Sequence, residues 1–338
     1  MLTTELNHVL AGKSFTDRDM EDIMTQLASG EESEAQIGAL LAALRMKGET
    51  VAEITGAARF LRRVGVFIDC GSLETLDTCG TGGDGLATFN ISTTAAFVAA
   101  GAGVTVAKHG NRSVSSRCGS ADLLAELGYN LDATPEDMEE SIQSDGIGFL
   151  FAQRLHPVLG KLAGLRRSLG VRTIFNLLGP LANPAGSTRQ LTGVYDAAYT
   201  ERLATAMRNL GVRQAMVVHG HDGLDEISIN TPTRISELKD GAVRTYELQP
   251  ELYADDFGPA GAIAGGTPAE NAATTRAILD GTDRGPNRSI VLLNAGAAIY
   301  VAGKAADLHE GIRRAAESID SGRAADKLQA LIRNSRHD

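Results

Sequence analysis

The chain has 338 residues, a length that predicts two domains, or one large domain with an appendage. Its content of 43% hydrophobic and 22% charged residues is that of ordinary globular proteins and excludes a disordered chain. The net charge of −10, from 32 basic and 42 acidic residues, argues against a general nucleic-acid binder or a membrane-surface binder, since both are usually basic.

Three helices are expected in the first 70 residues. Each begins at a hydroxyl residue, has Asp, Gln or Glu three positions later, continues as an apolar stripe with helical spacing, and ends at a glycine. The three helices span 16–30, 33–48 and 50–65. We therefore expect a helical domain at 1–70 and an α/β domain at 71–338.

From residue 71 onward, short β-rich runs alternate with helical runs. Strands are expected at 73–78, 104–107, 190–195 and 215–218, and helices near 93–100, 122–127 and 199–210. Pro135 after Thr134 marks a further helix start, and an amphipathic helix is expected from about Ala305. This alternation is typical of an α/β fold with a mostly parallel central sheet.

Acidic residues are unevenly distributed. Residues 85–121 and 146–195 contain no Asp or Glu, although a chain with 42 acids in 338 residues should have several in each stretch. Both stretches carry Lys, Arg and His. Burial of these stretches is the alternative explanation, but it does not account for so many arginines. The pattern favours a focused pocket for a small polyanion.

A glycine-rich turn, DTCGTGGDG at 77–85, follows the first expected strand. Such a turn lets backbone N–H groups approach an anion closely. Gly80, Gly82 and Gly85 match GxGxxG, but no acid lies about 20 positions further on to hold a ribose, and the Walker A pattern is absent. We expect a phosphate or sugar-phosphate loop of another kind, in which Asp84 contacts ribose hydroxyls, an amide or a metal.

Two later segments suit the same ligand. NISTT at 90–94 opens an alanine-rich helix, where hydroxyls and free N–H groups form a phosphate seat and Ser92 is a candidate Mg²⁺ ligand. KHGNRSVSS at 108–116 follows the next expected strand and offers a cation and several donors, a composition that suits a pyrophosphate. A plain solvated loop is the alternative for the second segment.

Adjacent carboxylates, Asp225 and Glu226, follow the strand expected at 215–218. At the carboxyl end of a strand such a pair favours Mg²⁺, although most isolated pairs are simply surface residues. His219 and His221 lack the partners of a zinc site and are read as loop residues.

The three cysteines, at 70, 79 and 118, form no CxxC pair and cannot close a complete disulfide set, so a reduced, cytoplasmic protein is expected. No activating base accompanies Cys79, and we assign it no nucleophilic role. The N-terminus MLTTELNHVL has neither a basic start nor an apolar core, so no signal peptide is expected.

Six segments, in order and spacing, resemble the anthranilate phosphoribosyltransferase family. They are DTCGTGGDG at 77–85, FNIST at 89–93, VAKHGNRSVSS at 106–116, GSADLL at 119–124, LRRSLGVRTIFNLLGPLANP at 165–184 and GLDEIS at 223–228. The resemblance implies a fold like that of the pyrimidine nucleoside phosphorylases, with homodimerisation through the helical domain. It also implies a Mg²⁺-dependent step of tryptophan biosynthesis: anthranilate and phosphoribosyl pyrophosphate give N-(5-phosphoribosyl)anthranilate and pyrophosphate.

The resemblance also implies residue roles at the matching positions. Phosphoribosyl pyrophosphate is expected at Gly80, Gly83, Asp84, Thr88, Asn90, Ser92, Thr93, Lys108, His109, Gly110, Asn111, Arg112, Ser113, Val114, Ser115, Ser116 and Ser120. Mg²⁺ is expected at Ser92, Asp225 and Glu226. Anthranilate is expected to contact Asn111 and Arg166, with Arg167 as the alternative arginine, and to enter past His109 and His156.

Lys108, Asn111 and Arg166 are the residues expected to act in catalysis. A neutral aromatic amine needs placement more than a strong base, so we expect catalysis by positioning and electrostatics. Two alternatives remain open. One is a pyrimidine nucleoside phosphorylase, whose glycine loop resembles KHSTGG, with Lys in place of Thr78. The other is a non-catalytic nucleic-acid-binding paralogue, in which a basic surface and broken motifs are expected.

Overall fold

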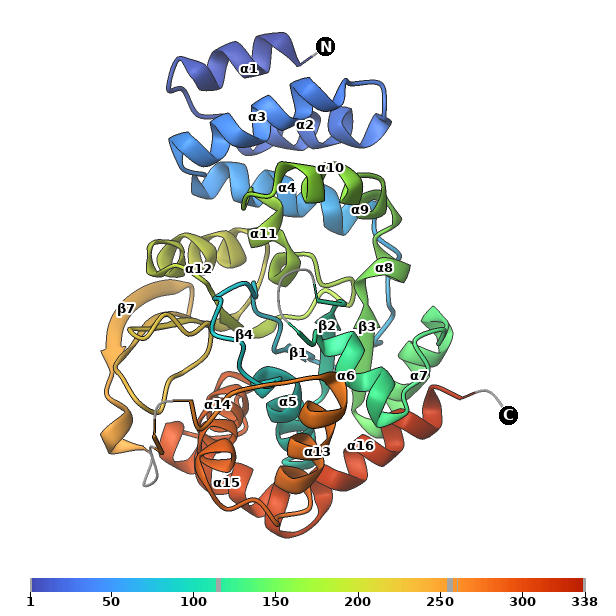
Figure 1. Ribbon diagram of the computed structural model, residues 1–338, viewed down its shortest axis with the longest axis vertical. Helices are drawn as coiled ribbons and strands as arrows, with labels where there is room; N and C mark the ends of the chain where they lie inside the picture. Colours follow the sequence, from blue (N-terminus) through green and yellow to red (C-terminus); the bar gives the residue numbers. More distant parts are fainter. Residues whose placement is uncertain (1, 114–116, 254–257, 260, 337–338) are drawn as a thin grey trace.

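The computed structural model describes residues 2–113, 117–253, 258–259 and 261–336. Figure 1 shows a small helical part that contains the N-terminus and a larger part in which helices surround a sheet. This arrangement confirms the predicted fold class. Among the described residues, no helix combines the length and the apolar character needed to cross a membrane.

The helical part begins with four helices. They are α1 (Thr3–Leu10), α2 (Asp17–Ser29), α3 (Glu34–Lys47) and α4 (Val51–Val64). The last three confirm the predicted helices. Thr16 and Thr50 each accept a hydrogen bond from the N–H group three residues later, and the acid there completes a capping box. Helix α1 was missed because Leu2, its N-cap, provides no capping side chain.

The sheet has seven strands in the order β3-β2-β1-β4-β5-β6-β7. They are β1 (Leu76–Asp77), β2 (Val106–Gly110), β3 (Ile147–Phe151), β4 (Arg189–Gly193), β5 (Gln214–Gly220), β6 (Thr233–Lys239) and β7 (Ala242–Leu248). All pairs from β3 to β5 are parallel, and β6 and β7 continue the sheet antiparallel. The mostly parallel sheet is therefore confirmed.

The strand limits differ most from the prediction in the first two strands. The first strand has only two residues, Leu76–Asp77. The second continues to Gly110, because its backbone pairs with β3 as far as Phe151. Lys108, His109 and Gly110 are therefore strand residues, and their prediction as loop residues was wrong.

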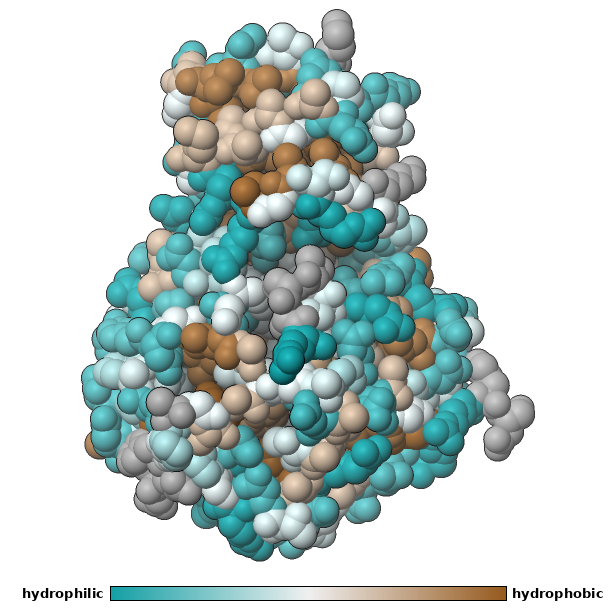
Figure 2. Space-filling view, viewed as in Figure 1, coloured by the Kyte–Doolittle hydropathy of each residue, from teal (hydrophilic) through white to brown (hydrophobic). Residues whose placement is uncertain are grey.

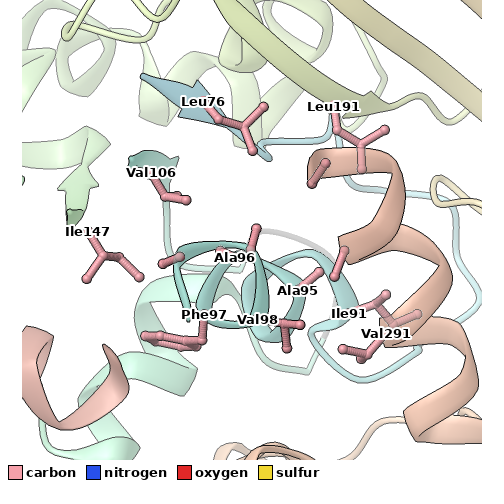
Figure 3. Close-up of a cluster of buried hydrophobic side chains, with 14 of the residues drawn as sticks. Leu76, Ile91, Ala95, Ala96, Phe97, Val98, Val106, Ile147, Leu191 and Val291 are labelled. Atoms are coloured by element: carbon pink, nitrogen blue, oxygen red, sulfur yellow. The ribbon is translucent and has the colours of Figure 1, made fainter. Parts of the chain in front are cut away.

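Helix α5 (Ile91–Gly101) forms the centre of the larger core and is buried on nearly every face. Figure 3 shows its side chains among apolar residues from four strands and from α14 (Pro286–Val301). The labelled contributors outside α5 are Leu76, Val106, Ile147, Leu191 and Val291. The many alanines of α5 allow this close packing, since small side chains let neighbouring backbones approach closely.

The other helices of the larger part cover the sheet and its ends. They are α6 (Ser120–Leu127), α7 (Pro135–Asp145), α13 (Pro268–Leu279), α15 (Leu308–Asp320) and α16 (Arg323–Asn334), with short 3-10 turns η2 (Ala197–Tyr199) and η3 (Pro250–Leu252). The C-terminal helix expected from Ala305 is thus two helices, because Gly322 adopts φ 80° between them. Helices α14 and α15 cross closely: a Cβ added at Gly311 would lie 2.3 Å from the Gly296 carbonyl oxygen.

A second core joins the N-terminal helices to the middle of the chain. This stretch contains α8 (Ala152–Leu155), α9 (Pro157–Lys161), α10 (Ala163–Leu169), α11 (Phe175–Leu178), the 3-10 turn η1 (Gly179–Leu181) and α12 (Thr200–Asn209). Leu165 and Leu203 share that core with Leu41 and Leu61. In Figure 1, α9 and α10 lie with the N-terminal helices. The domain boundary at residue 70 stays a prediction. In the structure, a later segment of the chain also packs with the N-terminal helices.

Candidate active site

The glycine loop follows β1 and lies across the end of β4. Thr81 N–H donates to the Gly193 carbonyl at 2.9 Å, and Tyr195 N–H donates to Thr81 Oγ1 at 3.1 Å. A Cβ at Gly80 would lie 3.4 Å from Asp225 Oδ2, so this glycine lets the loop approach the carboxylate pair. Gly83 has φ 78°, a conformation that favours glycine. The predicted loop is thus directly beside the predicted metal ligands.

Asp77 is buried next to this loop and accepts several hydrogen bonds. Its Oδ1 accepts hydrogen bonds from the N–H groups of Cys79 at 3.0 Å and His109 at 3.1 Å, and its Oδ2 accepts from Asn183 Nδ2 at 2.8 Å. Burial raises the pKa of Asp77 to about 6, although nearby Lys108 opposes the shift. Sequence reasoning gave Asp77 no role. An acid at the end of a buried strand was the available signal.

Lys108 is buried on β2 and points to the base of the glycine loop. Its Nζ donates to both the carbonyl oxygen and the Oγ1 of Thr78, each at 3.1 Å. Its charge also opposes the pKa increase of Glu226. Lys108 therefore supplies a positive charge between the loop and the carboxylates.

Three carboxylates gather at the end of β5 and in the loop. Burial raises the pKa values of Asp225 and Glu226; Asp84 raises that of Asp225 further, and Asp225 does the same to Glu226. Glu226 Oε1 accepts from Ser92 N–H at 3.0 Å, and Asp84 Oδ2 is buried without a hydrogen-bond partner in the described structure. Such a group of repelling oxygens suits a hard cation.

Among the described residues, no group of three or more His, Cys, Asp or Glu side chains is arranged to hold a metal ion by itself. Mg²⁺ does not need such a group, since it usually takes one or two carboxylates and completes its shell with water and substrate phosphates. The residues present therefore fit that ion.

The start of α5, the predicted phosphate seat, makes contacts within the chain that the sequence did not predict. Asn90 is the N-cap but makes no capping hydrogen bond. Its Nδ2 instead donates to the Cys118 carbonyl at 3.1 Å, and its Oδ1 accepts from Asn271 at 3.0 Å. Ser92 N–H, which we expected to be free, is bonded to Glu226 because the carboxylate reaches the helix N-terminus. Thr93 is buried, and Thr88 pairs with Ala264 in an isolated bridge.

The segment after β2 is held by the start of α6. Asn111 N–H donates to Ser120 Oγ at 3.1 Å. Asp122 binds Arg112 Nη1 through Oδ1 at 2.8 Å and accepts from Ser113 N–H through Oδ2 at 3.0 Å. Arg112 is therefore ion-paired in this structure. Three further predicted residues, Val114, Ser115 and Ser116, lie outside the described residues.

The two predicted entry-path histidines meet in the structure. The ring centroids of His109 and His156 are 5.2 Å apart. His109 Nδ1 lies 3.0 Å from the Gly179 carbonyl, which can only accept, so this nitrogen carries the proton. Burial lowers the pKa of His109 to about 3, helped by His156, and burial also lowers the pKa of His156. Both rings are neutral at pH 7.

Arg166 and Arg167 differ in their surroundings. Arg166 is half-buried on α10, with its guanidinium carbon 5.4 Å from the Phe175 ring centroid, and burial lowers its pKa. It has no acidic partner among the described residues, whereas Arg167 is exposed. A half-buried cation without a counter-ion suits an anionic ligand, which favours Arg166.

Arg172 is a further residue that sequence reasoning left without a role. Its guanidinium donates to the Gly83 carbonyl oxygen and lies 4.3 Å from the centroid of the Tyr195 ring. Arg172 lies in the 165–184 motif, but the sequence alone did not show that the connection between α10 and α11 reaches the glycine loop.

The space-filling view shows mainly hydrophilic side chains around the junction of the two parts (Figure 2).

Comparisons with known proteins agree along the whole chain. Residues 4–65 match the model of a glycosyl transferase family helical bundle domain, and residues 72–325 match that of its a/b domain. The anthranilate phosphoribosyltransferases of Desulfosudis oleivorans and Syntrophobacter fumaroxidans are 52% and 53% identical, over 98% of this chain and 98% of each relative.

Solved structures give the same result. The crystal structure of anthranilate phosphoribosyltransferase from Thermus thermophilus has a TM-score of 0.93 and 42% identity, covering 98% of this chain and 99% of that one. The Saccharomyces cerevisiae enzyme in complex with PRPP and Mg has a TM-score of 0.90 and 28% identity, covering 99% and 97%.

Proposed function

This chain belongs to the anthranilate phosphoribosyltransferase family, and we propose that the site described above carries out that family's reaction. The enzyme transfers the phosphoribosyl group of phosphoribosyl pyrophosphate to the amine of anthranilate, a step of tryptophan biosynthesis. The observation that carries the assignment of the site is the convergence of the glycine loop, Lys108 and the Asp225–Glu226 pair at one edge of the sheet.

We assign phosphoribosyl pyrophosphate to the glycine loop, the start of α5 and the segment after β2. The glycine loop supplies backbone N–H groups for the phosphates, and Lys108 places a positive charge beneath the loop. As the bond between the anomeric carbon and pyrophosphate breaks, negative charge grows on the leaving group. Fixed donors around that position stabilise this charge without reorganising.

Ser92, Asp225 and Glu226 are the residues that would hold Mg²⁺. The crowded carboxylates and the orphaned Asp84 oxygen support this assignment, as does the PRPP and Mg complex of the yeast relative. A bound Mg²⁺ ion would neutralise negative charge on pyrophosphate oxygens.

Anthranilate is assigned to the side of the site formed by Asn111 and Arg166. The planar guanidinium of Arg166 can pair with the anthranilate carboxylate in a forked contact. The amine of anthranilate is already neutral at pH 7, so its lone pair can attack once it is placed correctly. His109 and His156 are buried and neutral, so we assign them the roles of orienting anthranilate and excluding water, not of binding a charged group.

We further propose a homodimer that forms through the helical part, in a cytoplasmic protein. Leu10 and Met46 are 67% and 89% exposed there, and Figure 2 shows hydrophobic side chains gathered on that part. A partner surface would remove such side chains from water. Light scattering of the full chain tests this proposal, and a monomer at micromolar concentration would contradict it.

The reaction is tested by following the loss of anthranilate fluorescence with Mg²⁺ and phosphoribosyl pyrophosphate. We expect turnover that stops on chelation, returns with added Mg²⁺, and is lost in Asp225→Asn/Glu226→Gln. Folded protein without turnover would contradict the proposal. The alternatives have their own readouts: phosphorolysis of pyrimidine nucleosides, and retention on heparin at physiological salt.

A further inference from the structure

Arg172 lies in the connection between α10 and α11, outside the set of residues assigned above. Its two contacts are with the glycine loop and with the residue whose N–H binds that loop. It donates to the carbonyl oxygen of Gly83, and its guanidinium carbon lies 4.3 Å from the Tyr195 ring centroid. Among the described residues no acid forms an ion pair with Arg172. Its charge is thus directed to a loop carbonyl and an aromatic face.

The Gly83 contact is one of several that hold the glycine loop. Gly80 lies close to Asp225, since a Cβ there would be 3.4 Å from Oδ2, and Thr81 N–H donates to the Gly193 carbonyl of β4. Arg172 reaches Gly83 from the α10–α11 connection. A glycine-rich loop has many accessible conformations, so each such contact reduces the entropy lost when a ligand orders the loop.

Tyr195 links Arg172 to the helical part. The guanidinium carbon of Arg45, on α3, lies 6.0 Å from the Tyr195 ring centroid and 5.8 Å from that of Tyr199. Arg45 Nη1 also donates to the Tyr199 hydroxyl at 2.6 Å, and this hydroxyl donates to Glu49 at 2.6 Å. Cations and aromatic rings therefore alternate from the glycine loop to α3.

We propose that Arg172 is a positioning residue for the phosphoribosyl pyrophosphate loop, acting through Gly83 and Tyr195 rather than by touching the reacting atoms. This inference rests on the proposed function. Arginine is needed because its planar group can donate to a carbonyl and lie against a ring at the same time, which lysine cannot do equally well.

The test compares steady-state kinetics of the full chain with Arg172→Gln, Arg172→Lys, Tyr195→Leu and the Arg172→Gln/Tyr195→Leu double variant. Arg244→Gln, an exposed arginine on β7, is the matched control. We expect Arg172→Gln to raise KM for phosphoribosyl pyrophosphate roughly tenfold, with kcat and KM for anthranilate little changed. Arg172→Lys should lie between Arg172→Gln and the unmodified enzyme.

The double variant tests whether Arg172 acts through Tyr195 or by contacting the substrate directly. If Arg172 acts through Tyr195, the double variant should be no worse than the more impaired single variant. Multiplying effects, or a large fall in kcat in Arg172→Gln, would overturn the proposal, as would an unchanged KM in that variant. If Tyr195→Leu does not fold, the glutamine and lysine variants still decide the question.

Failure of the inference is distinguishable from failure of the proposed function. Calorimetric titration with phosphoribosyl pyrophosphate and Mg²⁺ measures affinity without turnover. An unmodified enzyme without turnover would contradict the proposed function. An active enzyme whose affinity is the same with Arg172→Gln would contradict only the role of Arg172.

Discussion

Buried charges beneath the site are the main finding at the scale of single residues. Asp77 faces three donors, from Cys79, His109 and Asn183, and Lys108 lies close by. We expect Asp77→Asn to lower the free energy of unfolding by about 3 kcal/mol, since an amide turns one acceptor into a donor and removes the charge opposite Lys108. Urea denaturation measures this. Asp132→Asn, with a side chain 90% exposed, is the control.

The histidine pair predicts a pH dependence of stability. The pKa of His109 is about 3 in the folded protein, below its ordinary value of about 6.5 in an unfolded chain. The unfolded state therefore binds the proton first, so stability is complete above about pH 6.5 and is lost as pH falls toward 3, by up to about 1.4 kcal/mol per pH unit. Urea denaturation between pH 7 and 5 should give a shallower slope for His109→Gln.

The same substitution tests whether a base takes part in the reaction. Burial lowers the pKa of His109 to about 3, so its ring is a weak base at pH 7, and its Nδ1 is already bound to Gly179. We therefore expect kcat of His109→Gln to stay within about tenfold of the unmodified enzyme. A loss of about 100-fold or more would identify a general base instead.

Arg166 and Arg167 provide a matched pair on one helix. We expect Arg166→Gln to raise KM for anthranilate roughly 10- to 100-fold, because a hydrogen-bonded charge contact is lost. Arg167→Gln should behave as the unmodified enzyme, since Arg167 is exposed. Fluorescence kinetics with varied anthranilate measure both, and the reverse result would move the carboxylate contact to Arg167.

At the scale of helices and strands, the sequence predicted the features that depend on residues close together in the chain. Three helices with a hydroxyl cap and a glycine stop were predicted within a residue or so, because caps satisfy N–H groups close in sequence. The extension of β2 to Gly110 was missed, because pairing with β3 is a long-range contact. The β6–β7 hairpin was missed although Asp240 and Gly241 mark its turn.

Two helix glycines should respond oppositely to substitution. Gly311→Ala should destabilise the protein by about 1–3 kcal/mol, because its Cβ would lie 2.3 Å from the Gly296 carbonyl oxygen where α15 crosses α14. Gly164→Ala, on α10 with no neighbour within 4 Å, should stabilise by about 0.5–1 kcal/mol. Thermal and urea denaturation measure both, and equal effects would contradict the packing argument.

At the scale of the whole molecule, only some of the cations in the two acid-free stretches belong to the proposed site. These stretches contain Lys108 and Arg166, which we assign to ligand binding. They also contain Arg154, which pairs with Asp132, 22 residues away, and Arg189, which pairs with Glu74, 115 residues away. Sequence could locate the basic stretches and the motifs in them. It could not separate site cations from structural ones, because the partners are set by the fold.

The return of the chain to the helical part has a consequence for synthesis on the ribosome. Helices α1–α4 are complete at Val64, but their shared core also needs Leu165 and Leu203. At roughly 5–20 residues per second, these partners emerge on the order of ten seconds later. During that interval the nascent helices expose an unfinished apolar face. The N-terminal fifth of the chain therefore needs protection from aggregation before translation ends.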